Sequence, residues 1–267
     1  MSIKLFVTDL DGTLLLKGQQ VSQENIDAVQ AAVKAGVTVT IATGRMYQAA
    51  LPVAQALGVD VPIITYNGAL IKSTSGEVFY ENFLPEQVVA DVVSFCQEKG
   101  WYIQSYSHDE LCLPARTSEA EGYENAQNVK GRVLGWDGLK THGEAVCKLL
   151  SITSGAEETE ARIREMRAHF GPGLAVMRSN ANYVEIVNPG VSKAAGIRHL
   201  AAKLGIPLDE IMAIGDANND LPMLKAAGHS IAMGNAVPEV KAVCDAVTTT
   251  CEENGFAKAI YDYVLRG

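Results

Sequence analysis

The chain has 267 residues, of which 48% are hydrophobic and 20% charged; this excludes a disordered chain, a collagen-like fibre and a coiled-coil rod. The formal net charge is −9 and no basic cluster is present, so we expect neither nucleic acid nor an anionic membrane surface as a partner. No apolar run approaches the roughly 20 residues of a membrane-spanning helix, and the start of the sequence lacks the features of a signal peptide, so we expect a cytoplasmic protein.

Short apolar runs alternate with amphipathic segments in the first part of the chain. Each run stops at a turn signal, which is typical of strands buried on both faces of a parallel sheet. Ser22 can cap the first helix and Gly36 ends it, whereas Pro52 indicates a kink or a late start in the second. The predicted strands are 3–7, 37–42 and 61–66, and the predicted helices are 22–36 and 46–57. This alternation predicts a doubly wound parallel sheet.

The middle of the chain has a different pattern. Residues 101–106 alternate between polar and apolar, as in a strand with one exposed face. Residues 117–141 are weakly patterned and rich in Gly and Asn. The other predicted elements are a hairpin arm at 76–81, helices at 85–100 and 157–170, and strands at 149–153, 174–178 and 183–187. This mixture predicts an α+β unit that is distinct from the flanking sheet.

After residue 190 the earlier pattern resumes. Ser192 can cap a helix that Gly205 ends. The predicted strands are 211–214, 231–233 and 246–248, and the predicted helices are 192–204, 221–227 and 257–265. We therefore predict an α/β fold with a Rossmann-like doubly wound parallel sheet core, formed by residues 1–83 and 188–267, and an inserted α+β cap domain of residues 84–187.

Acidic residues stand where predicted strands of the core end. Ligands of open α/β sheets bind outside the carboxyl ends of the strands, so chemistry is expected there. Asp9 and Asp11 follow the first strand, and side chains two residues apart at a strand end point the same way. Asp216, at another strand end, would add a third carboxylate. Oxygen ligands of this kind favour a hard octahedral ion, Mg²⁺ above all, which would offset an anionic substrate in an acidic protein.

The same residues suit phosphoryl transfer. An aspartate nucleophile such as Asp9 can approach a phosphate when Mg²⁺ cancels the repulsion. Asp11 can protonate the leaving alcohol and then accept a proton from the water that hydrolyses the aspartyl phosphate. Thr43 and the N–H of Gly44 would donate neutral hydrogen bonds. Lys193, in the first turn of its helix, would stabilise the transferred phosphoryl group together with the helix end.

Four motifs occur in order along the chain. They are 6–15 (FVTDLDGTLL), 42–45 (ATGR), 185–193 (EIVNPGVSK) and 215–220 (GDANND). On these motifs the chain resembles the haloacid dehalogenase-like superfamily of phosphohydrolases and, within it, the Cof-type subfamily. The insert between the second and third motifs is similar to the mobile α/β cap of that subfamily.

The resemblance implies a role for each motif residue. Asp9 would be the nucleophile and Asp11 the acid and base. Mg²⁺ would be held by the Asp9 side chain, the Asp11 backbone carbonyl and Asp216, with the Asp220 carboxylate behind them. The residues implied to contact phosphate are Leu10 through its backbone, Thr43, Gly44, Lys193 and Asn219.

We therefore predict a Mg²⁺-dependent phosphatase that hydrolyses small phosphorylated metabolites, such as sugar phosphates, through an aspartyl-phosphate intermediate. One alternative is a phosphomutase or phosphotransferase that passes the phosphoryl group to a second sugar. A signalling receiver lacks the acid two residues after the nucleophile and the long insert, and intact acids argue against a non-catalytic metabolite-binding regulator. We expect a monomer or weak homo-oligomer whose partner is a small phosphorylated metabolite.

Overall fold

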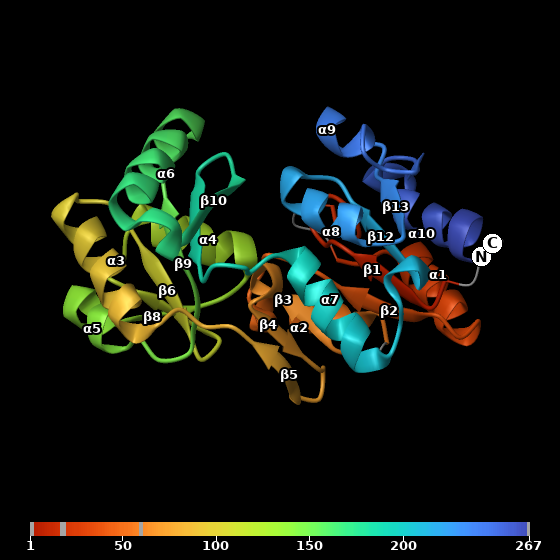
Figure 1. Cartoon of the computed structure of the whole chain (residues 1–267), viewed down its shortest axis with the longest axis horizontal. Helices are drawn as coiled ribbons and strands as arrows, with labels where there is room; N and C mark the ends of the chain where they lie inside the picture. The colour runs from red at the N-terminus through yellow and green to blue at the C-terminus, as the bar shows by residue number, and fades with distance from the viewer. Residues whose placement is uncertain (1–2, 17–19, 59–60, 266–267) are drawn as a thin grey trace. The chain divides into compact units, whose positions relative to one another are not determined.

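Segments from both ends of the chain build one parallel sheet in the computed structural model, which describes residues 3–16, 20–58 and 61–265 (Figure 1). Its strands lie in the order β14–β13–β12–β1–β2, and every neighbouring pair is parallel. The fully buried β1 lies between β12 and β2, so these three strands end at the same edge. The strands are β1 (Leu5–Thr8), β2 (Thr38–Ile41), β12 (Ile211–Gly215), β13 (His229–Ala232) and β14 (Ala246–Val247).

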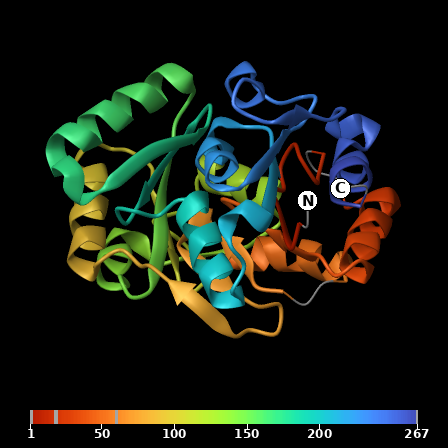
Figure 2. The ribbon, with the colours of Figure 1, turned by 45° about the vertical axis from the view of Figure 1, so that its right-hand side comes forward.

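Helices flank this sheet, which confirms the predicted fold class. The helices are α1 (Gln23–Lys34), α2 (Tyr47–Ala56), α7 (Lys193–Leu204), α8 (Leu221–Ala226), α9 (Pro238–Lys241) and α10 (Gly255–Ala259), which continues as a π-helical turn. As predicted, the Ser22 hydroxyl caps α1, and Gly205 ends α7 in the left-handed conformation. α1 and α10 lie side by side although they come from opposite ends of the chain (Figure 2). None of the helices formed by the described residues has the length and apolar character that crossing a membrane requires.

The third predicted strand, 61–66, belongs to a separate small sheet and not to the parallel sheet in which we expect it. β3 (Ile63–Thr65) meets the parallel sheet through an isolated bridge between Ala42 and Ile64. It then pairs antiparallel with β4 (Leu70–Lys72), in a small sheet ordered β3–β4–β5, where β5 is Val78–Glu81. The chain reverses in the tight turn Tyr66–Gly68, so the returning β4 takes the hydrogen-bonding groups of β3.

The chain divides into two compact units. We call Met1–Tyr80 with Ser192–Gly267 the core unit and Glu81–Val191 the inserted unit. From the sequence alone we place the limits of the insert at 84 and 187, inside those of the structure. The core unit contains the parallel sheet and every residue of the motifs at 6–15, 42–45 and 215–220.

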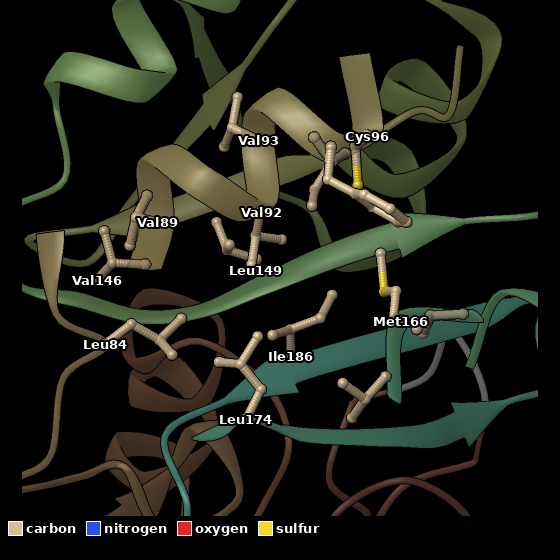
Figure 3. Packing of buried hydrophobic residues seen from close by; sticks show 14 of the residues in the cluster. Leu84, Val89, Val92, Val93, Cys96, Val146, Leu149, Met166, Leu174 and Ile186 are labelled. Carbon is tan, nitrogen blue, oxygen red and sulfur yellow. The ribbon is translucent and has the colours of Figure 1, made fainter. Parts of the chain in front are cut away.

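The inserted unit is built on a mostly antiparallel sheet ordered β10–β11–β9–β6–β7–β8. One face packs against helices in a hydrophobic cluster, where Val89 and Val92 of α3 lie over Leu149 of β9 (Figure 3). The strands are β6 (Gln104–Ser107), β7 (Glu110–Leu113), β8 (Gly131–Val133), β9 (Val146–Ile152), β10 (Ala175–Asn180) and β11 (Tyr183–Val187). The helices are α3 (Glu86–Glu98), α4 (Ser118–Gln127), α5 (Gly135–Thr141) and α6 (Ala156–Phe170).

Two features of the inserted unit depart from expectation. β6 is buried on both faces, not on one. Its Gln104 is tolerated inside because it accepts a hydrogen bond from the Tyr102 hydroxyl (2.6 Å) and donates one to the Tyr106 hydroxyl (2.7 Å). The weakly patterned stretch 117–141 contains α4, β8 and α5. Thr117 caps α4 by accepting the Ala120 N–H (3.3 Å), and Glu124 of α4 accepts the Gly131 N–H at the start of β8 (2.6 Å).

Candidate active site

The motif residues of the core unit lie at the carboxyl edge of its parallel sheet. Asp9 follows β1, and its N–H donates to the Ile214 carbonyl of β12 (3.1 Å). Asp216 follows β12, and Thr43 follows β2, which lies on the other side of β1. Lys193 is the first residue of α7, whose preceding Ser192 caps the helix by accepting the Ala195 N–H. Distant parts of the sequence therefore meet at this edge.

The Lys193 ammonium lies between two carboxylates. Its Nζ is 2.5 Å from Asp9 Oδ1 and 2.6 Å from Asp220 Oδ1, and all three side chains are buried. The other oxygen of Asp220 accepts the backbone N–H groups of Asp216 (2.9 Å) and Ala217 (3.0 Å). Asp220 therefore fixes both the position of Lys193 and the loop that carries Asp216.

An acidic group that could hold a metal ion forms here. Among the described residues, Asp9, Asp216 and Asp220 each offer a carboxylate oxygen, and these oxygens lie within 4.8 Å of one another. Because both oxygens of Asp220 already accept hydrogen bonds, Asp9 and Asp216 are better placed to be ligands. Closely spaced carboxylate oxygens are the donors that hard divalent cations prefer.

The protonation of this group reflects its burial. Burial raises the pKa of the Asp9 carboxyl from an ordinary value of 3.8 to about 8; Asp220 adds to the rise and Lys193 opposes it. Burial and then the charge of Asp220 raise the pKa of Asp216 to about 6. Burial alone would lower the pKa of Lys193, but Asp220 and Asp9 hold it above its usual range. When all three carboxyls are ionised, their negative charge exceeds the positive charge of the Lys193 ammonium. An added cation therefore favours the ionised forms.

The Asp11 side chain departs from the expectation that it faces the same point as Asp9. Its carboxylate is 53% exposed and pairs with the Arg45 guanidinium in a two-pronged contact. The Arg45 Nε to Asp11 Oδ2 distance is 2.9 Å, and the Nη2 to Oδ1 distance is 2.5 Å. The acidic group therefore contains the Asp220 carboxylate where we expected that of Asp11, because Arg45 attracts the Asp11 side chain.

The loop after Asp11 is shaped around Asp216. Gly12 has φ +84°, and a Cβ there would lie 2.5 Å from Asp216 Oδ2, so a side chain would displace the carboxylate. The Thr13 hydroxyl donates to Asp216 Oδ1 (2.9 Å). The Asn235 amide donates to the Gly12 carbonyl (2.8 Å). The Thr13 hydroxyl of this loop therefore fixes Asp216 Oδ1, whereas Asp216 Oδ2 faces Gly12.

The predicted phosphate contacts Leu10, Thr43, Gly44 and Asn219 lie on the loops that follow β1, β2 and β12, and they differ in burial and in hydrogen-bond partners. Thr43 is buried, and its Oγ1 accepts the N–H of Arg45 (3.1 Å), which leaves the hydroxyl proton to donate. Gly44 follows it, half-buried. Leu10 is buried, and its carbonyl accepts the N–H of Leu15 (2.8 Å). Asn219 is half-buried in the 3₁₀ turn Asn218–Asp220, next to Asp220.

Reasoning from the sequence gave no role to three residues that shape this site. Arg45 stands in the second motif, and its charge two residues after Thr43 is a signal that could have been used. Thr13 stands in the first motif, where a hydroxyl beside Asp-Gly is a possible acceptor or donor. Asn235 carries no local signal, because only the tertiary fold brings it to Gly12.

Comparison with known proteins points to one family over nearly the whole chain. The model of the haloacid dehalogenase-like hydrolases matches residues 6–260. The chain is 32% identical to the 5-amino-6-(5-phospho-D-ribitylamino)uracil phosphatase YwtE of Bacillus subtilis, over 99% of each chain. It is 29% identical to the phosphatase YwpJ of the same organism, over 96% of this chain and 98% of the relative.

Structural comparison agrees. A crystal structure of a haloacid dehalogenase-like hydrolase from Bacteroides thetaiotaomicron superposes with a TM-score of 0.89 at 30% identity, over 97% of this chain and 99% of the other. The fold, the acidic group at the strand ends and the extent of these matches agree with one another. The chain therefore belongs to the haloacid dehalogenase-like hydrolases, as its Cof-type motifs predict, and is a phosphomonoester hydrolase.

Proposed function

We propose that the chain is a Mg²⁺-dependent phosphatase of small phosphorylated metabolites, sugar phosphates or similar monoesters, which acts through an aspartyl phosphate on Asp9. The observation that carries the proposal is the buried Asp9 carboxylate, 2.5 Å from the Lys193 ammonium and grouped with Asp216 and Asp220. One Asp9 oxygen accepts from Lys193, and the other is available to attack phosphorus.

The donor set suits Mg²⁺. The carboxylates of Asp9 and Asp216 and the backbone carbonyl of Asp11 would hold the ion, and Asp220 would orient the Asp216 loop from behind. When bound, the ion offsets the negative charge of the phosphate and of the carboxylates around it. The acidic group, which a single ammonium does not neutralise, supports this assignment.

The chain's own residues would perform the reaction in two steps. Asp9 attacks phosphorus, and the bond to the ester oxygen breaks while protonated Asp11 gives its proton to the leaving alcohol. Water then attacks the phosphorus of the aspartyl phosphate, Asp11 takes its proton, and inorganic phosphate and free Asp9 result. Thr43, the Gly44 N–H, the Leu10 backbone, Asn219 and Lys193 would hold the phosphoryl oxygens. In the structure the exposed Asp11 carboxylate is paired with Arg45, so its role as acid and base requires the Asp11 side chain to turn from Arg45 toward the phosphoryl group.

A metabolite screen tests the proposal. Phosphate release is measured from a panel of phosphorylated metabolites and from p-nitrophenyl phosphate, with Mg²⁺, with EDTA, and with Mg²⁺ restored after EDTA. We expect release from small monoesters in Mg²⁺, loss of release in EDTA, and recovery on restoration. Release that EDTA leaves unchanged contradicts the Mg²⁺ requirement, and no release from any monoester contradicts the phosphatase itself.

We expect Mg²⁺ to raise the melting temperature more at about pH 8 than at about pH 5. The pKa values of Asp9 (about 8) and Asp216 (about 6) lie above the ordinary 3.8, so without a cation the native state binds more protons than the unfolded state between these values. Its stability therefore falls as the pH rises through this window, and Mg²⁺, which competes with those protons, restores it. At about 100 times its Kd, the ion should add about 2.7 kcal/mol.

Differential scanning fluorimetry with and without Mg²⁺ measures this effect. Asp216→Asn should lose most of the shift, whereas Asp27→Asn, an exposed acid on α1, should keep it. A shift that is equal at both pH values, or larger at the acidic one, would show that these carboxyls do not bind the ion.

A further inference from the structure

The strained turn Tyr66–Gly68 follows β3 and is hydrogen-bonded to the loop that carries Thr43. Tyr66, Asn67 and Gly68 have φ values of 52°, 57° and 104°, three successive residues in the left-handed region. Non-glycine residues rarely adopt this conformation, and it persists only where the surrounding structure imposes it. Tyr66 and Asn67 are also buried. The packing around the turn therefore imposes its left-handed conformation, unlike in a hairpin that is exposed to solvent.

On one side the turn is hydrogen-bonded to the loop that carries Thr43. The Asn67 N–H donates to the Thr43 carbonyl (2.9 Å), and the Tyr66 N–H donates to the Arg45 carbonyl (3.0 Å). The Thr43 N–H donates in turn to the Ile64 carbonyl of β3 (2.9 Å). These bonds tie the backbone of residues 43–45 to the turn on both sides of Gly44.

On the other side the turn presses against the start of α7. A Cβ on Gly68 would lie 2.3 Å from the Ser192 carbonyl oxygen, and a Cβ on Gly196 would lie 2.5 Å from Ile64 Cγ2. Both positions therefore exclude a side chain. The turn thus links the Thr43 loop to the helix turn that presents Lys193.

The Asn67 side chain lies against Gly44 itself. A Cβ on Gly44 would lie 3.1 Å from Asn67 Oδ1, 3.2 Å from Nδ2 and 3.4 Å from Cγ, so the carboxamide lies broadside on that glycine. Glycine at 67 would adopt the same backbone with less strain and would bury no polar side chain. The backbone conformation of the turn therefore does not explain why residue 67 carries a carboxamide. The feature that the carboxamide adds is the contact with Gly44.

We propose that Asn67 is a positioning residue of the phosphate site, and that its carboxamide holds the Thr43–Gly44 peptide in the orientation that presents the Thr43 hydroxyl and the Gly44 N–H to the phosphoryl group. The inference rests on the proposed function, because it takes Thr43 and Gly44 as phosphate donors. Asn67 acts through these groups, so its removal should misplace donors without removing them.

The substitution Asn67→Gly tests this role, since it removes the carboxamide and keeps a residue suited to positive φ. We expect kcat/KM for p-nitrophenyl phosphate to fall about 10- to 100-fold while the melting temperature does not fall. Orthovanadate, which mimics the transferred phosphoryl group, should lose more affinity than inorganic phosphate, because aligned donors matter most in the transition state. The matched control is Asn128→Gly, an exposed asparagine with φ 52° at the end of α4, which should leave both affinities unchanged.

The outcomes separate the two proposals. If the wild type hydrolyses the ester and Asn67→Gly keeps its kcat/KM and vanadate affinity, the role of Asn67 is overturned and the phosphatase stands. A lower melting temperature with equal losses of vanadate and phosphate affinity also overturns it, in favour of a purely structural role. A wild type that neither releases phosphate nor binds vanadate overturns the proposed function and, with it, this inference.

Discussion

Asp9→Asn should reduce phosphate release from p-nitrophenyl phosphate by on the order of 10⁴-fold or more, because it removes the only oxygen nucleophile that we assign to the reaction. The carboxamide oxygen of Asn is a far weaker nucleophile than a carboxylate, and it cannot form a stable acyl phosphate. Steady-state release of phosphate measures the loss, and mass spectrometry of the quenched wild type should detect the phosphorylated Asp9.

The fold of this variant should persist. Asn has the shape of Asp, its oxygen still accepts from Lys193, and it removes the repulsion from Asp220 and Asp216 that helps to raise the pKa of Asp9. We therefore expect a melting temperature at neutral pH no lower than that of the wild type. Asp245→Asn, in the same unit but bonded to Ser230, is the control that should stay active. Turnover of Asp9→Asn comparable to that of the wild type would exclude Asp9 as the nucleophile.

Lys193→Met should destabilise the core unit by about 3–5 kcal/mol and abolish turnover. The Lys193 ammonium is fully buried, and its raised pKa keeps it charged between Asp9 and Asp220. Methionine fills a similar volume but leaves both carboxylates without their counter-charge, which is the costly way to break a buried ion pair. Urea unfolding at neutral pH measures the loss of stability.

The chain offers a matched control in its inserted unit. Lys148 is also buried, and its Nζ lies 2.9 Å from Glu185 Oε1. Lys148→Met should cost a similar free energy of unfolding but retain hydrolysis of p-nitrophenyl phosphate at temperatures where it is folded. If Lys193→Met unfolds at the wild-type urea concentration, the buried charge group is not held together as described. If both variants lose activity alike, stability rather than chemistry explains the loss.

Local signals in the sequence were enough for much of the core. Short apolar or β-branched runs that end in polar turns predict β1, β2 and β12, because strands covered on both faces are mainly apolar. Thr40 of β2 is buried because its hydroxyl donates to the Pro62 carbonyl (2.5 Å). Ser22 and Ser192 mark the starts of α1 and α7, since a cap depends on the adjacent backbone alone. The clustering of Asp9 with Asp216 also follows from chain order, because parallel strands end at a common edge.

The ion pairs of the site, the sheet that β3 joins and the burial of β6 were decided by the tertiary structure alone, because each depends on which groups meet in space. Asp11 turns to Arg45 and Asp220 joins Asp9, a choice between charged partners that chain spacing does not express. β3 pairs with β4 because a left-handed turn returns the chain. β6 is buried on both faces because Gln104 finds hydroxyl partners there. Strand ends and caps are set by neighbours in the sequence, whereas ion pairs, buried polar contacts and sheet edges are set by neighbours in space.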